Sequence, residues 1–295
     1  MRQLRAELAL AGVTVVWGTT FVVVKAALAD VSTYVFLAMR FWLAAVALIL
    51  IYARTLRKSG VRVGPGVLAG TILFTAYVFQ TTGLERTTAS NSAFLTGLSI
   101  PMVPFVGSLV YKNWPRPVEL AGILVASAGM ALLTLPGGSG WRWQMSPGDL
   151  LSLLCAVTFA VHIVVVGHYS QLEGFQSLAV VQIVTAAALA AVSVGFTAPV
   201  RFHMTPTVAV AVVVTGLFAT ALAFTTQAWA QQYTSASRAA LILTLEPPVA
   251  WLTSYVLTGE RLANRGKVGA GLILLGILAV ELTKVVTIPA AGTPD

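Results

Sequence analysis

The chain has 295 residues, of which 57% are hydrophobic and only 9% are charged, whereas soluble domains carry roughly a quarter of charged residues. This composition excludes a soluble globular protein, because too little charge is present to cover a surface that faces water. The formal net charge is +8, but Lys and Arg stand in short connections between apolar runs, which is typical of membrane topology signals and not of nucleic-acid binding.

Ten apolar segments follow one another along the chain, and each is long enough to cross a bilayer as a helix, for which about 20 residues are needed. We expect helices rather than strands, because lipid offers no partner to an unpaired backbone group. The segments lie near residues 8–26, 34–53, 65–84, 89–111, 118–136, 148–169, 175–196, 206–230, 236–257 and 266–285. The sequence therefore predicts an all-α membrane protein with ten transmembrane helices.

The first segment is preceded by Arg2 and Arg5, as in a secretory signal peptide. However, the apolar run continues to Val24 and no small-residue cleavage site follows it, so we interpret it as the first membrane span. The distribution of basic residues predicts that both termini lie in the cytoplasm, and we expect the membrane to be a bacterial inner membrane. In the second half, Arg265 and Lys267 would then lie outside, so the charges of that half do not fix its orientation.

The two halves of the chain are related in sequence. Gln227 follows Gln80, and Pro248 follows Pro101, at the same offset of 147 residues. We expect a first five-helix unit over residues 1–141, a second over 142–285, and a C-terminal tail over 286–295. Since five is odd, two similarly folded units must be inverted relative to each other, which is the architecture of many secondary transporters with a substrate site near the bilayer midplane.

Prolines stand inside the expected fourth and ninth helices, where each removes one backbone hydrogen bond. Because Pro101 and Pro248 occupy matching places, we predict that they break the two helices at hinges beside a site, although each alone would also fit a packing kink. Glu246 lies near the middle of the ninth helix, where an ionised carboxylate is costly and is a functional candidate. It could bind a substrate ammonium, carry a proton, or serve as a hydrogen-bonded structural group.

Aromatic and polar side chains lie deep in the other expected helices. Trp17 and Thr20 share one face of the first helix, and Phe159 and His162 occupy the related places in the sixth. They suit an amphipathic or aromatic ligand, although bulky core packing and an interhelical hydrogen bond of His162 explain them as well. Four further polar residues must turn inward from lipid and complete the expected substrate site: Tyr77, Gln80, Asn91 and Gln227.

Other features are assigned to structure. Arg40, Lys25 and Arg86 lie near span ends, and we expect them to extend to the interface. Glycines at seven-residue spacing in the fifth and tenth helices indicate a scaffold or a dimer face.

No nucleotide-binding loop, metal motif or catalytic triad is recognisable, so we expect no cofactor, no metal and no enzymatic activity. The expected partners are a small molecule and the bilayer, and the chain is expected to be a monomer.

Four motifs resemble the EamA branch of the drug/metabolite transporter superfamily: Val16-Trp17-Gly18-Thr19-Thr20-Phe21, Arg40-Phe41, Thr88-Ala89-Ser90-Asn91-Ser92-Ala93-Phe94-Leu95-Thr96-Gly97-Leu98, and Leu245-Glu246-Pro247. The resemblance covers nearly the whole chain. It implies ten helices from a duplicated five-helix unit, with helices 1, 3, 4, 6, 8 and 9 around a central cavity, helices 2 and 7 mobile, and helices 5 and 10 peripheral. It also implies export of amino acids, including aromatic ones, or of other small metabolites by alternating access. A proton-coupled drug or cation efflux pump is the alternative, and an enzyme acting on lipid-linked substrates is a more distant one.

Overall fold

A computed structural model describes residues 2–87, 89–112, 114–134, 146–172, 174–195, 200–258 and 264–286. These residues form α-helices and one π-helix. The helices are α1 (Arg2–Ala27), α2 (Thr33–Ser59), α3 (Val63–Arg86), α4 (Ala89–Gly97), α5 (Ser99–Tyr111), α6 (Pro117–Thr134), α7 (Pro147–Leu172), α8 (Phe175–Val194), α9 (Pro206–Val213), the π-helix η1 (Val214–Leu222), α10 (Ala223–Ala230), α11 (Ala236–Leu243), α12 (Glu246–Thr258) and α13 (Asn264–Val286).

Six helical stretches are long and apolar enough to cross a membrane: 2–27, 33–58, 63–86, 147–172, 175–194 and 206–230. The last stretch runs through α9, η1 and α10, and α4–α5 and α6 add shorter apolar helices. The chain is therefore an all-helical, multi-pass membrane protein, as the sequence predicts. The expected boundary between the two halves falls at residues 135–145, outside the part of the chain that the structure describes, as does most of the C-terminal tail.

Two of the expected spans are broken near their prolines. The stretch 89–111 is interrupted at Leu98, between α4 and α5, and the stretch 236–257 at Thr244 and Leu245, between α11 and α12. At both breaks the backbone turns more tightly, since Leu98 N–H bonds the carbonyl of Leu95 and Thr244 N–H that of Leu241. The breaks precede Pro101 and Pro248 by a few residues because a proline disturbs the carbonyl four residues before it.

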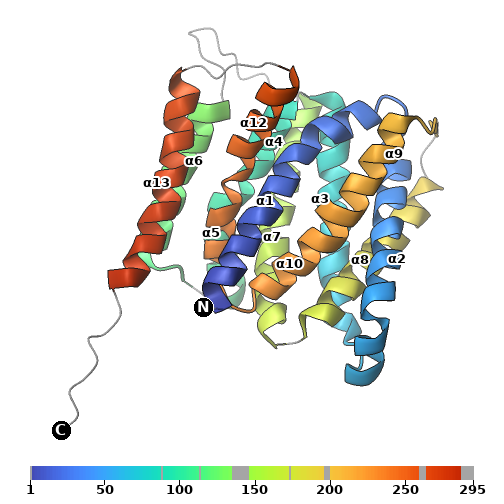
Figure 1. Ribbon diagram of the computed structural model, residues 1–295, viewed down its shortest axis with the longest axis horizontal. Coiled ribbons are helices and arrows are strands. Elements are labelled where there is room, and N and C mark those ends of the chain that lie inside the picture. The colour runs from blue at the N-terminus through green and yellow to red at the C-terminus, as the bar shows by residue number, and fades with distance from the viewer. Residues whose placement is uncertain are drawn as a thin grey trace.

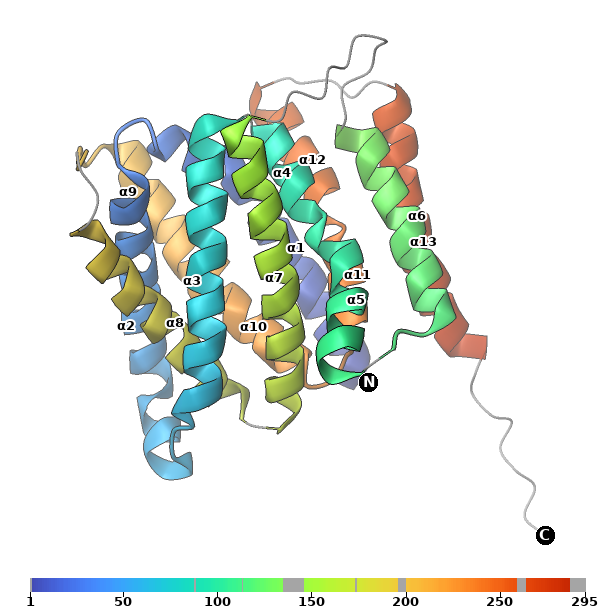
Figure 2. The same ribbon diagram turned by 180° about the vertical axis from the view of Figure 1, so that it is seen from behind.

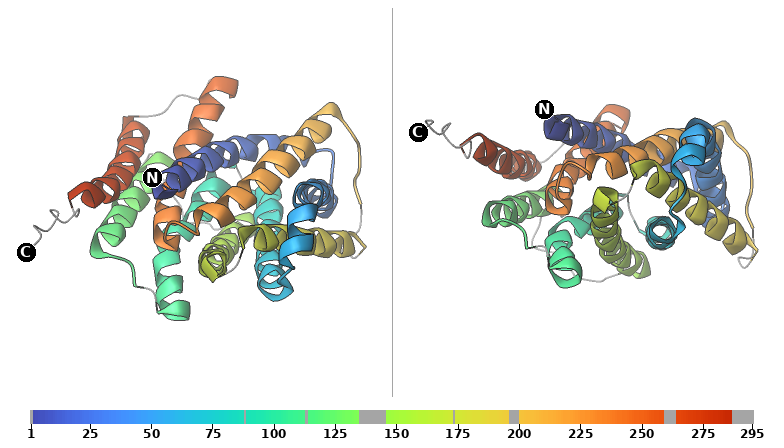
Figure 3. Two further views of the ribbon diagram at one scale, coloured as in Figure 1. Left: turned by 60° about the horizontal axis from the view of Figure 1, so that its bottom comes forward. Right: turned by 90° about the horizontal axis from the view of Figure 1, so that it is seen from below.

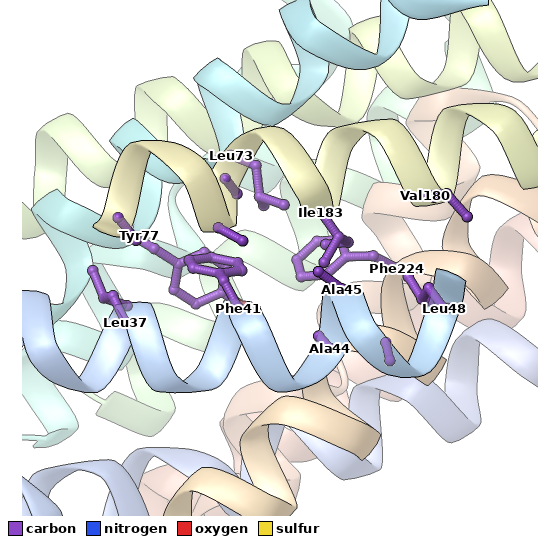
Figure 4. Packing of buried hydrophobic residues seen from close by; sticks show 14 residues of the cluster. Leu37, Phe41, Ala44, Ala45, Leu48, Leu73, Tyr77, Val180, Ile183 and Phe224 are labelled. Atoms are coloured by element: carbon purple, nitrogen blue, oxygen red, sulfur yellow. The ribbon is translucent and has the colours of Figure 1, made fainter. Parts of the chain in front are cut away.

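The helices stand side by side in one bundle, and the start of α1 and the end of α13 lie at the same end of it (Figures 1 and 2). The pair α6 and α13 forms one edge, and α2 and α8 lie at the opposite edge (Figure 3). A buried apolar cluster joins α2, α3, α8 and α10, with Phe41, Leu73, Tyr77, Ile183 and Phe224 among its members (Figure 4). This cluster packs α2, α3 and α8 against one another and against α10.

Glycines set the contact between α6 and α13. A Cβ atom on Gly129 would lie 2.5 Å from the carbonyl oxygen of Gly269, and one on Gly276 would lie 2.6 Å from that of Gly122. The two helices therefore run antiparallel, with their backbones in contact at both glycine pairs. The expectation that these glycines could form a dimer face is wrong for these four positions, because they face each other within the chain.

Substituting Gly129 by Ala is expected to lower the thermal midpoint of the purified protein by several degrees, since overpacking of a tight contact costs about 1–3 kcal/mol. Gly271→Ala on α13 is the matched control, because a Cβ there would meet no atom within 4 Å. Equal melting temperatures for the two variants would show that α6 and α13 do not pack through Gly129.

Candidate functional site

A cavity lies in the middle of the bundle. Its wall is formed by residues of α1, α2, α3, α4, α5, α7, α10, α11 and α12, and none of the described side chains of α6 and α13 contributes to it. The lining residues are Trp17, Thr20, Phe21, Val24, Arg40, Tyr77, Gln80, Thr81, Leu84, Ala93, Thr96, Gly97, Ser99, Ile100, Phe159, His162, Ile163, Phe224, Gln227, Leu243 and Glu246.

Four aromatic rings of the wall contact one another. The ring centroid of Trp17 lies 5.2 Å from that of Phe224, and the centroid of Tyr77 lies 5.4 Å from that of Phe159. Tyr77 and Phe224 complete the group at 6.1 Å. Most of these contacts are edge-on, the arrangement that aromatic quadrupoles favour. The rings give the cavity an apolar wall suited to a hydrophobic or aromatic group.

The π-helix η1 turns a backbone carbonyl toward the site. The oxygen of Ala219 accepts a hydrogen bond from Trp17 Nε1 at 2.9 Å and a longer one from Arg40 Nη2 at 3.4 Å. π-helical turns change the regular pairing of helix carbonyls and are frequent at functional sites. The orientation of Trp17 is thus fixed by a polar bond as well as by packing.

Arg40 lies in the wall of the cavity, which corrects the expectation that it extends to the membrane interface. Its side chain is buried, with Nε donating to Thr220 Oγ1 at 2.6 Å and Nη2 donating to Tyr77 Oη at 2.9 Å. The guanidinium carbon also lies 4.2 Å from the centre of the Tyr77 ring, within cation–π distance. Arg40 does not reach the interface because it lies two turns inside α2, where side chains of α3 and η1 surround it.

Lys25 is a second correction of the same kind. Its Nζ donates to the backbone carbonyls of Leu84 and Thr87 at the end of α3. Cations stabilise a helix C-terminus, where carbonyl groups lack intrahelical partners. Lys25 therefore ties α1 to α3 instead of extending to the interface.

Three buried polar side chains of the second half of the chain are only partly hydrogen-bonded. His162 Nε2 lies 3.0 Å from Gln182 Oε1, and Gln227 Nε2 donates to Gln231 Oε1 at 3.2 Å. His162 Nδ1, Gln182 Nε2 and Gln227 Oε1 have no partner among the described residues. Buried polar atoms are normally paired, so His162 and Gln227 offer unused hydrogen-bonding capacity at the cavity.

Glu246 begins α12, directly after the break that separates α12 from α11, and its side chain borders the cavity. At this point α12 packs closely against α1, because a Cβ atom on Gly18 would lie 2.9 Å from the backbone carbonyl oxygen of Glu246. Within the described residues, no ion pair holds the carboxylate. The broken helix thus places an acidic group at the wall of the cavity.

Eight of the nine residues that the sequence indicates for the site line this one cavity: Trp17, Thr20, Tyr77, Gln80, Phe159, His162, Gln227 and Glu246. The ninth, Asn91, belongs to α4, but its side chain lies outside the described part of the structure. Arg40 and Phe224 are the main residues that the sequence analysis did not include. Phe224 could have been found, since it stands 147 residues after Tyr77, the offset that relates the two halves.

A second, larger hollow opens at the end of the bundle where α1 begins. Its wall includes Tyr111, Arg116, His168 and Arg238, and its volume is about 1050 Å³, compared with about 70 Å³ for the central cavity. At about 10–15 Å³ per water molecule, the central cavity holds only a handful of waters. A ligand larger than a few waters can occupy it only if the surrounding helices move apart.

An apolar layer separates the two hollows. Ile100 borders the central cavity, whereas Val103, nearly one turn further along α5, borders the larger hollow, which we call the vestibule. Both belong to one buried apolar cluster that also contains Ile163 and Leu243. In this conformation the central cavity is therefore closed from the vestibule by packed side chains of α5, α7 and α11.

Comparison with known proteins identifies relatives along the whole chain. The sequence model of the EamA-like transporter family matches residues 4–135 and 146–282. A protein of Archaeoglobus fulgidus, described as an uncharacterized transporter, is 36% identical over 282 residues, which cover 96% of this chain and 87% of that protein. The uncharacterized transporter YyaM of Bacillus subtilis is 25% identical over 308 residues, covering 100% of this chain and 99% of that protein. A solved crystal structure with 19% sequence identity has the same fold, with a TM-score of 0.79 over 95% of this chain and 98% of its own.

Proposed function

Because this chain belongs to the EamA-like transporter family, we propose that it exports amino acids, including neutral and aromatic ones, across a bacterial inner membrane. The observation that carries this proposal is the central cavity, whose wall combines the four contacting aromatic rings with polar side chains. Such a wall binds an apolar side chain through burial of its surface, at about 25 cal/mol per Å². It also leaves polar groups for the charged end of the ligand.

We infer that the cavity lies between two five-helix units of ten membrane spans, bounded by residues 1–141 and 142–285. Support comes from the family model, which matches the chain twice, once in each unit. It also comes from lining residues that pair between the units. Three pairs have an offset of 142 residues: Trp17 with Phe159, Thr20 with His162, and Phe21 with Ile163. Four pairs have an offset of 147 residues: Tyr77 with Phe224, Gln80 with Gln227, Thr96 with Leu243, and Ser99 with Glu246. An approximate twofold axis through the cavity accounts for this pairing.

The inverted relation of the two units is supported by reciprocal contacts. The contact of Gly129 with Gly269 is the counterpart of the contact of Gly276 with Gly122, and these pairs join antiparallel helices. Equivalent helices that run antiparallel across a twofold axis belong to units of opposite orientation in the membrane. The N-terminus, and with it the vestibule, is assigned to the cytoplasmic side by the basic residues at that end.

A second reciprocal contact ties the units at both ends of the bundle. Thr87 Oγ1 donates to Asp149 Oδ1 at 2.7 Å, and Thr234 Oγ1 donates to Glu7 Oε1 at 3.3 Å. Each bond joins the start of one broken helix to the first helix of the other unit. We propose that alternating access opens one of these ends at a time, with Pro101 and Pro248 beside the hinges, so that the closed cavity can widen around its ligand.

The alternative is a proton-coupled pump for drugs or other cations. It is favoured by one observation, the carboxylate of Glu246 at the cavity without an ion-pair partner among the described residues. The two functions differ in what drives transport. If an imposed pH gradient accelerates the efflux of lipophilic cations while amino acids neither bind nor move, the pump replaces the amino-acid exporter.

A thermal-shift screen of metabolites on the purified protein tests the proposed function. We expect neutral and aromatic amino acids to raise the melting temperature, because a ligand at ten times its dissociation constant adds about 1.4 kcal/mol to the stability of the folded state. Trp17→Ala should abolish this shift, since it removes one of the four aromatic rings. Trp42→Ala on α2 is the matched control, because the Trp42 side chain is 48% exposed on the outside of the bundle. The absence of any shift with amino acids in the unsubstituted protein would contradict the proposal.

A further inference from the structure

Arg40 carries a positive charge into the interior of the bundle. Its side chain is 3% exposed, and among the described residues no carboxylate lies within the 4.0 Å that defines an ion pair. An unpaired charge in a low-dielectric interior is costly unless hydrogen bonds or a counter-charge compensate it. The partners that Arg40 does have, the Tyr77 and Thr220 hydroxyls and the Ala219 carbonyl, are all neutral.

The hydrogen bonds of Arg40 leave part of its guanidinium unused. A guanidinium has five N–H donors, one on Nε and two on each terminal nitrogen. Nε donates to Thr220, and Nη2 donates to Tyr77 and Ala219. In the described structure, Nη1 therefore keeps two N–H groups without a protein acceptor, on a residue that borders the central cavity.

The three hydrogen bonds that hold Arg40 leave its Nη1 group in a position to bind an anion. Thr220, Tyr77 and Ala219 hold the guanidinium from one side, so the planar group is fixed while Nη1 stays available. A fixed guanidinium is well suited to a carboxylate, which has oxygens for charge-assisted hydrogen bonds. Lysine or glutamine would not reproduce this arrangement.

A complementary charge lies in the same cavity. Glu246 of α12 and Arg40 of α2 both belong to its wall. Gln227 Oε1, an acceptor without a partner among the described residues, belongs to the same wall. The cavity thus provides donors on Arg40 and acceptors on Glu246 and Gln227, with the aromatic rings as the remaining surface.

We propose that Arg40 binds the α-carboxylate of the transported amino acid through Nη1, and that Glu246 faces the α-ammonium group. The inference rests on the proposed function and makes it narrower, because the substrate must then carry both charges. An amine without the carboxylate lacks the partner of Arg40, and an acid without the ammonium leaves Glu246 uncompensated. The aromatic rings would discriminate among side chains only loosely.

Binding of two sets of matched ligands to the purified protein tests this inference. L-Phenylalanine is compared with phenethylamine, which lacks the carboxylate, and with 3-phenylpropanoate, which lacks the ammonium; L-leucine and isoamylamine form a second pair. We expect the amino acids to bind the unsubstituted protein about tenfold or more tightly than the amines, the effect of one charged hydrogen-bonded contact. Arg40→Gln should remove this difference by weakening the amino acids to the level of the amines, while Arg54→Gln, on the exposed part of the same helix, should preserve it.

The outcomes separate this inference from the proposed function. A structural role of Arg40 would weaken amino acid and amine equally in Arg40→Gln, and this result would overturn the assignment. If the unsubstituted protein bound phenethylamine as tightly as L-phenylalanine, Arg40 would not bind a carboxylate, although amino-acid transport could still stand. If neither amino acid bound while another class of metabolite did, the proposed function would fail and the inference with it. Should Arg40→Gln not fold, the comparison of ligands on the unsubstituted protein decides alone.

Discussion

Replacing Glu246 by Gln is expected to lower amino-acid transport at low substrate concentration by about ten- to a hundredfold, because a hydrogen bond to a charged group contributes about 1.5–3 kcal/mol. The substitution keeps the size of the side chain and removes its charge, so the α12 backbone and its contact with Gly18 should be unaffected. The measurement is the initial rate of labelled L-phenylalanine movement into proteoliposomes as a function of concentration. We expect the loss mainly in the Michaelis constant, since the contact acts in binding.

Ser99→Ala is the matched control for this prediction. Ser99 stands 147 residues before Glu246 and also borders the cavity, but it carries no charge. Its substitution should change transport only slightly. Unchanged transport in Glu246→Gln would exclude the carboxylate from the substrate path. If Glu246→Gln kept its transport without a pH gradient but was no longer accelerated by an imposed one, Glu246 would instead be assigned to proton movement.

Breaking the ion pair between Arg238 and Glu119 is expected to give the largest loss of stability. Arg238 Nε donates to Glu119 Oε1 at 2.7 Å, and the two side chains are only 10% and 7% exposed. Glu119 also accepts a bond from the backbone N–H of Arg116 at the start of α6. Because removal of one partner leaves a buried charge, Arg238→Met or Glu119→Leu alone should cost about 3–5 kcal/mol and lower the thermal midpoint strongly.

The double variant Arg238→Met/Glu119→Leu distinguishes a structural pair from a ligand site. Replacing both charges by apolar groups is often nearly neutral, so most of the lost stability should return, and substrate affinity should resemble that of the unsubstituted protein. Additive losses in the double variant would show that the two residues do not act as a pair. Restored stability with lost binding would place the vestibule wall in the substrate site.

Much of the fold follows from patterns that are local in the sequence. Uncharged apolar runs of about 20 residues predict the helices, and the prolines at 101 and 248 predict where two of them break, because both signals lie in continuous stretches of the chain. The π-helix η1 was not predicted, since no residue in 214–222 requires it and its carbonyl at Ala219 is used by side chains about 180 and 200 residues away.

The candidate site was partly predictable for a different reason. Trp17, Phe159 and Glu246 stand too deep in their helices for the membrane interface, and depth can be counted along the chain. Arg40 was missed because a basic residue near a span end commonly extends to the interface. Only tertiary structure brings the Thr220 hydroxyl and the Tyr77 ring beside it.

Counterflow of labelled L-phenylalanine tests most directly whether the central cavity carries amino acids across the membrane. Proteoliposomes are loaded with a high concentration of unlabelled L-phenylalanine, and the entry of a trace of labelled amino acid is followed against liposomes without protein. We predict transient accumulation of the label above its external concentration, strongly reduced by Trp17→Ala and preserved in Trp42→Ala. Entry no faster than into protein-free liposomes, for L-phenylalanine and for every other amino acid tested in the same way, would contradict amino-acid transport by this protein.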